Sequence, residues 1–188
     1  TLFFISCKGS EAIIPETENV STYKNPIIPR SLPDPTVMKA SDGNFYLYAT
    51  EDIRNVPIFH SSDLVNWNFL GTAFTDQTRP TFVSGGGIWA PDINYVNGKY
   101  VLYYSMSVWG GEWSCGIGVA TADHPEGPFT DHGKLFISDE IGVQNSIDPC
   151  YFEENGKKYL FWGSFRGIYG IELSDDGLSV KPGAQKVQ

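Results

Sequence analysis

Three aspartates that stand beside prolines are the residues of this sequence best suited to chemistry. Asp34 and Asp148 each precede a proline, whereas Asp92 follows one, and intervals of 58 and 56 residues separate the three. Carboxylates that meet beside aromatic surfaces are what hydrolysis of a glycosidic bond needs, because one acid protonates the departing oxygen while a carboxylate activates water or attacks directly. An Asp beside a Pro is also common in capped turns. Three copies at similar spacing favour a functional role.

Tryptophans supply flat apolar faces in the same part of the chain. Trp89 belongs to the same motif as Asp92, and Trp109, Trp113 and Trp162 lie further along. Such faces stack on sugar rings in carbohydrate sites and are equally typical of a hydrophobic core. Both roles therefore stay open for each tryptophan.

A repeated unit follows the aspartates and must position them. A few residues after each one, a glycine begins an aromatic, strand-like run, at residues 43–50, 98–105 and 156–164. Units of this length, built from strands and tight turns, cannot bury their own faces and must stack on their neighbours or close with them. The repeat predicts an all-β chain that forms part of a β-propeller.

Each unit is predicted to contain four antiparallel strands. In the first unit we expect strands at residues 36–39, 45–50 and 57–61 and a fourth through Gly71, and later units repeat this order from residues 93 and 150. No helical period persists for three turns. Because the innermost strands of a propeller line its central channel, we expect aspartates at the starts of these strands to converge at one mouth.

The charge balance argues against a nucleic-acid partner. The chain has 22 acidic and 13 basic residues, a formal net charge of −9, and no cluster of Lys or Arg, whereas binding to a phosphate backbone needs such a cluster. Hydrophobic residues make up 41% of the sequence, which is enough for a sizeable core. A globular protein that acts on a neutral ligand fits this composition.

The first residues resemble the end of a bacterial lipoprotein signal. An apolar run leads through Ser6 to Cys7. We predict that residues 1–24 are a signal-peptide remnant and lipoprotein tether, with lipid on Cys7 as the membrane contact, and that residues 25–188 are a partial propeller. The protein would then be exported, as a cell-surface lipoprotein or into the periplasm. The alternative is an apolar terminus that arose by chance.

Cysteines and histidines give no indication of a metal site. Cys115 and Cys150 fall in strand-like runs, where a cysteine is usually a buried apolar residue. A disulfide between them stays open in an exported protein. The histidines, His60, His124 and His132, share no metal-ligand spacing. These residues predict neither a metal site nor a required cofactor.

Four motifs stand out between about residue 25 and the end of the chain. They are Asn25-Pro26-Ile27-Ile28 with Asp34-Pro35-Thr36-Val37, Trp89-Ala90-Pro91-Asp92, Asn145-Ser146-Ile147-Asp148-Pro149 and Gly163-Ser164-Phe165-Arg166-Gly167-Ile168. Together they resemble family 43 glycoside hydrolases. Within the family, the last two motifs resemble the arabinan endo-1,5-α-L-arabinosidases more than the β-xylosidases. The resemblance implies a five-bladed β-propeller, and inverting cleavage of α-L-arabinofuranosyl linkages in arabinan, a plant cell-wall polysaccharide.

The same resemblance implies roles for individual residues. Asp34 resembles the general base that activates water, and Asp148 resembles the carboxylate that raises the pKa of the catalytic acid and orients it. The residues implied to bind substrate are Trp89, Asp92, Gly110, Asn145, Ser146, Ile147, Ser164, Phe165 and Arg166. Arabinanases usually carry Trp at the position of Arg166, so the shape of that subsite is expected to differ.

The catalytic acid of the family is a glutamate on a later blade, past Asp148. Three units at about residues 30–188 are fewer than the four to eight blades of a closed propeller. We therefore expect this sequence to be a fragment of about three blades, without the acid and with little activity alone. Glu126 has a similar Glu-Gly context, but it belongs to an outer turn and is not interpreted as the acid.

Three alternatives stay open at this point. The same fold could serve a β-xylosidase or an exo-acting arabinofuranosidase, and a propeller could bind carbohydrate without catalysis. The complete motifs around Asp34 and Asp148 favour an enzyme. Calcium in the channel is a further implication of the resemblance, with no ligands that the sequence identifies.

Overall fold

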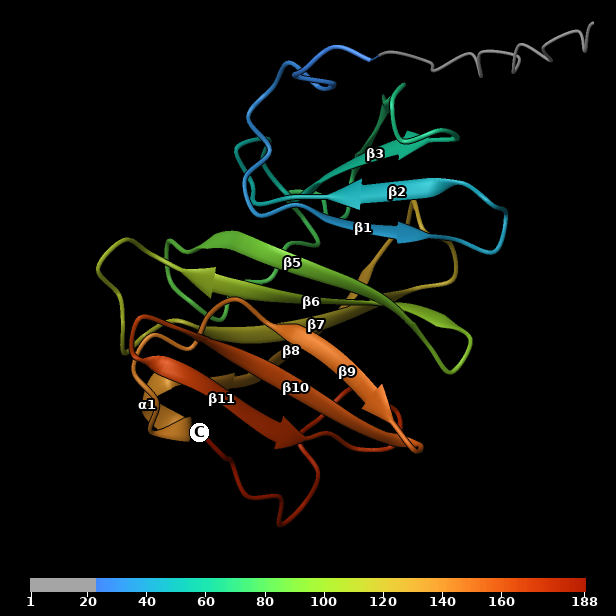
Figure 1. Ribbon diagram of the computed structural model, residues 1–188. Coiled ribbons are helices and arrows are strands. Elements are labelled where there is room, and N and C mark those ends of the chain that lie inside the picture. The colour runs from blue at the N-terminus through green and yellow to red at the C-terminus, as the bar shows by residue number, and fades with distance from the viewer. Residues whose placement is uncertain (1–22) are drawn as a thin grey trace, which may run out of the picture.

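The computed structural model describes residues 23–188, whose strands form three antiparallel sheets in chain order (Figure 1). The first sheet contains β1 (Thr36–Lys39), β2 (Phe45–Tyr48), β3 (Pro57–Ser61) and β4 (Asn68–Thr72). The second contains β5 (Gly87–Val96), β6 (Lys99–Ser107), β7 (Gly116–Ala122) and β8 (Thr130–Ile137). The third contains β9 (Cys150–Glu154), β10 (Lys157–Ser164) and β11 (Gly167–Glu172). A short helix, α1 (Ser138–Ile141), follows β8. The all-β prediction is confirmed.

Tight turns with positive φ join neighbouring strands into hairpins. Asn97 and Gly98, with φ of 50° and 83°, connect β5 to β6. Asn155 and Gly156, with φ of 52° and 74°, connect β9 to β10. Two-residue turns of this kind match the twist of the flanking strands, and Asn-Gly adopts them with little strain. The repeated units are thus built from strands and tight turns, as the sequence predicts.

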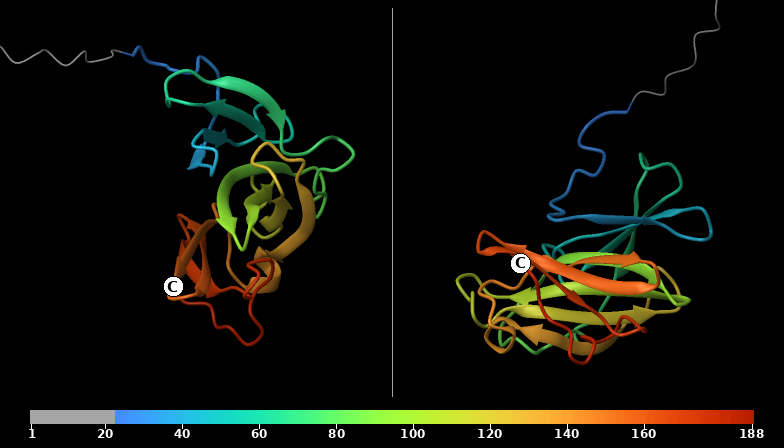
Figure 2. Two further views of the ribbon diagram at one scale, coloured as in Figure 1. Left: turned by 90° about the vertical axis from the view of Figure 1, so that its right-hand side faces the viewer. Right: turned by 60° about the horizontal axis from the view of Figure 1, so that its bottom comes forward.

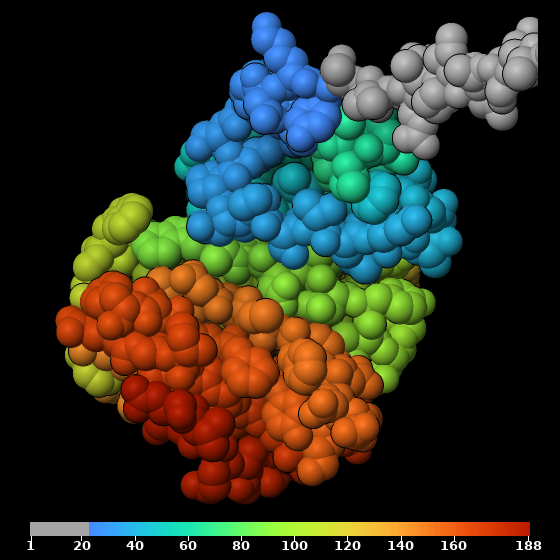
Figure 3. Space-filling view, in the orientation of Figure 1, coloured from blue at the N-terminus to red at the C-terminus, as the bar shows by residue number. Residues whose placement is uncertain are grey.

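The three sheets stand side by side with the second in the middle (Figure 2 and Figure 3). β1 packs against β5, and β5 packs against β9. The first strand of each unit therefore lies next to the first strand of the following unit, as innermost strands do in a propeller. The sheets of residues 23–188 do not close into a ring, so the number of blades stays a prediction.

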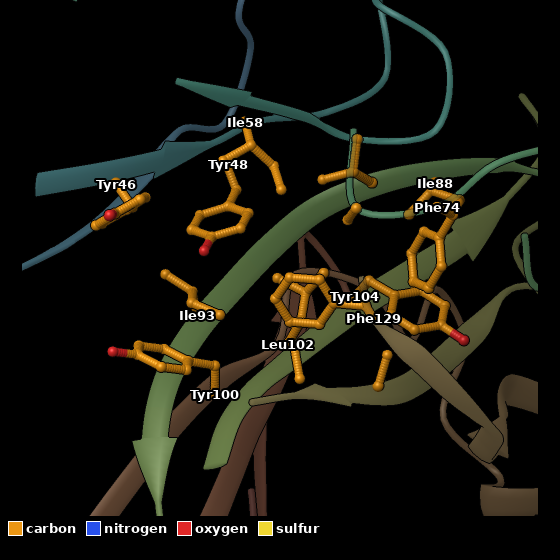
Figure 4. Close-up of a cluster of buried hydrophobic side chains, with 14 of the residues drawn as sticks. Tyr46, Tyr48, Ile58, Phe74, Ile88, Ile93, Tyr100, Leu102, Tyr104 and Phe129 are labelled. Atoms are coloured by element: carbon orange, nitrogen blue, oxygen red, sulfur yellow. The ribbon is translucent and has the colours of Figure 1, made fainter. Parts of the chain in front are cut away.

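Two hydrophobic clusters fill the spaces between the sheets. One joins the first sheet to the second and includes Tyr48, Phe74 and Tyr104 (Figure 4). The other joins the second sheet to the third and includes Tyr103 and Trp162. Tyr103 and Tyr104 are neighbours on β6, and successive side chains of a strand point to opposite faces. β6 therefore serves both clusters, and eight of its nine residues are buried.

The structure departs from the predicted strands at three places. β5 begins at Gly87 rather than Ile93, so Asp92 lies inside a strand instead of at its mouth. The third sheet has three strands instead of four. The helix α1 was not expected, because its four residues make about one turn, which is too short for a sequence period to reveal.

Two further predictions concern the cysteines and the N-terminal segment. Cys115 is buried, Cys150 is exposed and neither is bonded to another cysteine, so the disulfide left open does not form. Almost all of the predicted tether at residues 1–24, including Cys7, lies outside the described residues. Within residues 23–188, no helix has the length and apolar character needed to span a membrane.

Candidate active site

A cleft of about 420 Å³ opens where β1, β5 and β9 begin, and residues of all three sheets line it. Asp34 precedes β1, Trp89 lies near the start of β5, and Asp148 precedes β9. The other lining residues come from the end of β6 and the loop after it, the segment before β9 and the β10–β11 turn: Ser107, Val108, Trp109, Gly110, Gly111, Glu112, Asn145, Ile147, Ser164 and Phe165. Most of the residues that the sequence indicated for the site thus lie together. Asp92, Ser146 and Arg166 are not among the lining residues.

Each sheet contributes one residue in the left-handed region immediately before a proline. φ is 49° at Asp34, 37° at Ala90 and 58° at Asp148. Residues other than glycine rarely adopt such values, and those that do often lie at functional sites. The counterpart of Asp34 and Asp148 in the second unit is therefore Ala90. Asp92, which the sequence analysis aligned with them, lies two positions further along β5.

Thr50, which follows β2, holds Asp34 in place. The backbone N–H of Thr50 donates to the carbonyl of Pro33 at 2.9 Å, and its hydroxyl donates to Oδ2 of Asp34 at 2.7 Å. The same hydroxyl oxygen accepts the backbone N–H of Ala90 at 2.7 Å. Asp34 itself is exposed. One carboxylate oxygen is thus fixed while the residue stays open to the cleft.

Asp148 is held through its backbone instead of its carboxylate. Its N–H donates to Oγ of Ser105 at 2.8 Å, and no donor within residues 23–188 bonds to its side chain. Asp148, like Asp34, is exposed as a residue. Partial burial of its carboxyl and the negative charge of Asp34 nevertheless raise the pKa of Asp148 to about 6. The two carboxylates are therefore close enough to influence each other.

Asp92 connects β5 to β9 and does not face the cleft. Its Oδ2 accepts the backbone N–H of Tyr151 at 2.7 Å and the side-chain amide of Asn94 at 2.9 Å. Burial raises the pKa of Asp92 despite these hydrogen bonds. Because Tyr151 lies three residues after Asp148, Asp92 helps to place the segment that carries Asp148.

Exposed aromatic rings border the cleft. Trp89 packs against Trp109 with ring centroids 5.1 Å apart. Trp109 is 94% exposed and Phe165 is 73% exposed. Flat apolar faces left in water at the edge of a cleft suit stacking on sugar rings. Trp162, by contrast, belongs to the core between the second and third sheets.

Glu112 links two walls of the cleft, and sequence reasoning missed it. Its Oε2 accepts hydrogen bonds from Nε and Nη2 of Arg166, both at 3.2 Å, and from Nε2 of Gln144 at 2.5 Å. Its carbonyl accepts the N–H of Asn145 at 2.7 Å. The guanidinium of Arg166 also lies over Phe165, 5.0 Å from the ring centroid. The glycine pair before Glu112 was the available signal, since loops between strands often carry site residues.

Ser146 supports the cleft from behind. Its side chain is fully buried. Its Oγ accepts the indole N–H of Trp162 at 3.1 Å and donates to the carbonyl of Val143 at 2.9 Å. Ser146 therefore shapes the segment before Asp148 without contacting the contents of the cleft.

Two of the three histidines serve in packing and hydrogen bonding. His60 packs edge-on against Tyr46, and Nε2 of His132 is hydrogen bonded to the hydroxyl of Thr121 at 2.8 Å. Across residues 23–188, no three or more His, Cys, Asp or Glu side chains are grouped so that they could hold a metal ion. Calcium stays an implication of the family resemblance, with no ligands assigned to it.

The cleft combines features that acid-base chemistry on a sugar requires. Both aspartates are exposed, one carboxylate is oriented by a hydroxyl, the other has a raised pKa, and aromatic rings stand at the border. Such a pair of unequal carboxylates can assume different roles in one reaction.

Known proteins resemble this chain in sequence and in structure. The family model described as glycosyl hydrolases family 43 matches residues 23–188. A probable arabinan endo-1,5-alpha-L-arabinosidase C of Aspergillus clavatus is 37% identical over 150 residues, which cover 78% of this chain and 46% of that protein. The extracellular endo-alpha-(1->5)-L-arabinanase 1 of Bacillus subtilis is 36% identical over 162 residues, which cover 80% of this chain and 48% of that protein.

A solved structure is also similar to this chain. The structure of a Cellvibrio cellulosa alpha-L-arabinanase complexed with arabinohexaose matches with a TM-score of 0.73 at 27% identity, over 85% of this chain and 53% of that one. The chain spans about half the length of the curated relatives it matches. Because the family model covers every residue that the structure describes, this chain belongs to family 43 of the glycosyl hydrolases.

Proposed function

We propose that the full-length protein hydrolyses α-L-arabinofuranosyl linkages in arabinan and its oligosaccharides with inversion of configuration. The observation that carries the proposal is the pair Asp34 and Asp148, which line one cleft but differ in their surroundings. The printed names of two relatives support the substrate, since both describe enzymes of arabinan. The neighbour named as a complex with arabinohexaose supports it as well.

In this proposal Asp34 is the general base. Its Oδ2 is fixed by the hydroxyl of Thr50, and the residue is exposed at the cleft. A water can then lie between the carboxylate and the anomeric carbon, as an inverting site requires, with its acid and base about 6.5–9.5 Å apart. A base within hydrogen-bond reach of that water removes its proton as it attacks.

Asp148 assists the catalytic acid in the same proposal. A carboxylate charge near an acid raises the pKa of that acid and keeps it protonated for donation to the leaving oxygen. The acid is a glutamate from a later part of the full-length protein. Glu112, the one glutamate that lines the cleft within residues 23–188, is already bonded to Arg166 and Gln144.

The proposal extends to the fold of the full-length protein, a five-bladed ring. The outer face of the third sheet supports it, because Phe152, Phe161 and Ile168 are exposed there and the rings of Phe152 and Phe161 lie 6.5 Å apart. A following blade would bury this apolar face.

Export is also proposed. The Bacillus subtilis relative is named as extracellular, and a polymeric plant substrate is met outside the cell. Attachment through a lipid on Cys7, or release into the periplasm, are the two forms of export that the first residues favour.

Activity of the purified full-length protein on linear α-1,5-arabinan tests the proposal. Wild-type protein should release arabino-oligosaccharides, and Asp34→Asn should lower kcat by about three orders of magnitude or more while arabinohexaose binding stays nearly unchanged, because the base acts in the transition state. Asp52→Asn, which changes an exposed aspartate just after β2, is the matched control and should keep wild-type activity.

The products distinguish the alternatives. A ladder of oligosaccharides that appears first indicates endo action, and a single small product indicates exo action. Hydrolysis of xylobiose without hydrolysis of arabinan would contradict the proposal and favour a β-xylosidase. Binding of arabinohexaose with no product from any substrate would favour a carbohydrate-binding role instead.

A further inference from the structure

In the first and third units, extending the strand registers by two residues identifies the residue opposite the aspartate on the neighbouring strand. Asp34 faces Thr50, and Asp148 faces Gly163. In the second unit Ser105 pairs with Trp89, and Ala90 is the next residue, where the β5 bulge begins. The residues that face the two aspartates are therefore a threonine and a glycine.

The hydroxyls of Thr50 and Ser105 connect each of the first two sheets to the next one. Oγ1 of Thr50 accepts the N–H of Ala90, and Oγ of Ser105 accepts the N–H of Asp148. A backbone N–H can only donate, so the hydroxyl oxygen is the acceptor in both contacts and its own proton is free to bond elsewhere. At Thr50 that proton goes to Oδ2 of Asp34. The donor and the acceptor of each of these hydrogen bonds therefore follow from the fact that a backbone N–H can only donate.

The third sheet cannot supply the same donor to Asp148. Gly163 has φ of 134°, and a Cβ atom built on it would lie 2.1 Å from the carbonyl oxygen of Gly167. No side chain fits there, and the N–H of Gly163 is used by the carbonyl of Ile147 at 2.8 Å. Asp148 therefore lacks the hydroxyl partner that Asp34 has, which agrees with the raised pKa of Asp148.

We propose that Thr50 is a positioning residue that makes Asp34, and not Asp148, the base of the pair. The N–H of Ala90 aligns the Thr50 hydroxyl, and the hydroxyl fixes one oxygen of the Asp34 carboxylate so that the other serves the attacking water. Thr50 does not line the cleft and so acts through Asp34. This inference rests on the proposed role of Asp34 as general base.

Two substitutions at Thr50 test the hydroxyl in the full-length protein on linear α-1,5-arabinan. Thr50→Val removes the hydroxyl at nearly constant shape and should lower kcat by about tenfold to a hundredfold, the effect of one hydrogen bond to a charged group. KM should change by less than about twofold, because the base acts in the transition state. Thr50→Ser keeps a hydroxyl and should recover most of the lost kcat.

A control substitution tests whether loss of any hydroxyl in the first sheet has this effect. Thr72 donates its hydroxyl to the carbonyl of Phe74 at 2.7 Å, also in a partly buried position. Thr72→Val should keep wild-type kcat. An equal loss of kcat in Thr72→Val would overturn the specific role of Thr50.

A double variant separates positioning from general structural damage. If Thr50 acts through Asp34, the residual rate of D34N/T50V at high enzyme concentration equals that of D34N. A further fall by the factor seen in T50V alone, or wild-type kcat in T50V, would overturn the positioning role and leave the base role of Asp34 intact. Wild-type activity of D34N would overturn the proposed function instead. If T50V does not fold, Thr50→Ala takes its place in the same comparison with the same criteria.

Discussion

At the scale of single residues, Asp34 and Asp148 have the same backbone geometry and different partners. Both adopt positive φ before a proline, a conformation that costs about 1–3 kcal/mol and persists only where neighbours hold it. Thr50 anchors the backbone beside Asp34, and Ser105 anchors the N–H of Asp148. The strained backbone therefore places the carboxylates, and the facing side chains decide how each of them is bonded.

The pKa of Asp148 leads to a prediction about stability. It is raised from 3.8 to about 6 in the fold, so the folded state binds more protons than the unfolded state in this window, and stability falls as pH rises through it. Asp148→Asn removes this loss of stability at high pH, because asparagine carries no ionisable carboxyl. The variant should raise the melting temperature at pH 8 clearly and at pH 4 much less.

The control variant for this prediction should change the melting temperature in the opposite direction. Backbone and side-chain hydrogen bonds from Asn66, and the N–H of Val65, lower the pKa of Asp63 in its turn, so its contribution to stability is present above the unfolded pKa and is lost as pH falls. Asp63→Asn should therefore lower the melting temperature at pH 8. Equal shifts for Asp148→Asn at both pH values would show that its ionisation does not affect folding.

At the scale of elements, the segment after β2 joins the first sheet to the second. The N–H of Glu51 donates to the carbonyl of Ile88 at 3.1 Å, and the N–H of Ile88 donates to Oε1 of Glu51 at 2.9 Å. Arg79 donates to both carboxylate oxygens of Glu51, and each side chain is 9% exposed. Burial by itself raises the pKa of Glu51, but the hydrogen bonds from Arg79, Asn55 and Ile88 lower it below its usual value. This ion pair keeps Thr50 and β5 in register.

Removal of Arg79 should therefore be costly. Arg79→Ala leaves the Glu51 carboxylate buried without its cation, and we expect the free energy of unfolding to fall by about 3–5 kcal/mol. Arg54→Ala is the matched control, because the pair Arg54 and Asp76 is exposed by 62% and 63% and such pairs contribute about 0–1 kcal/mol. Urea denaturation measures both. A similar small loss in the two variants would contradict a structural role for the buried pair.

At this scale, the sequence predicts the strands better than it predicts the contacts between them. The glycines and the aromatic, strand-like runs that follow them predicted the second strand of each unit, because these signals are local. The alignment of Asp92 with Asp34 was wrong in geometry, since an Asp on either side of a proline looks alike in sequence, and only φ identifies Ala90 as the counterpart. The contacts of Thr50 and Glu112 join segments far apart in the chain, and no local pattern encodes them.

At the scale of the whole molecule, the cleft exists only where the sheets meet. The second sheet carries hydrophobic clusters on both faces, while the third leaves Phe161 38% exposed on its outer face. In a closed propeller each blade packs between two neighbours and is buried on both faces, as the second sheet is here. The third sheet is expected to reach the same state in the full-length protein.

A charged side chain on the outer face of the third sheet tests whether this face is buried in the full-length protein. If a further blade covers the third sheet, Phe161→Glu should destabilise the full-length protein by about 3 kcal/mol or more, because a large apolar contact is lost and a carboxylate is buried. Tyr95→Glu, at a 57% exposed site on β5, should change stability by less than about 0.5 kcal/mol. Equal small effects in thermal denaturation would mean that the face stays in water.

The anomeric configuration of the first product tests the central claim most directly. Proton NMR of linear α-1,5-arabinan with full-length enzyme, recorded before mutarotation, should show release of β-anomers from the α-linked substrate, because a water held by Asp34 attacks from the face opposite the leaving group. Asp34→Asn should give no product signal in the same time. Release of α-anomers first, or a covalent sugar adduct on Asp34, would contradict the assignment of Asp34 as a base.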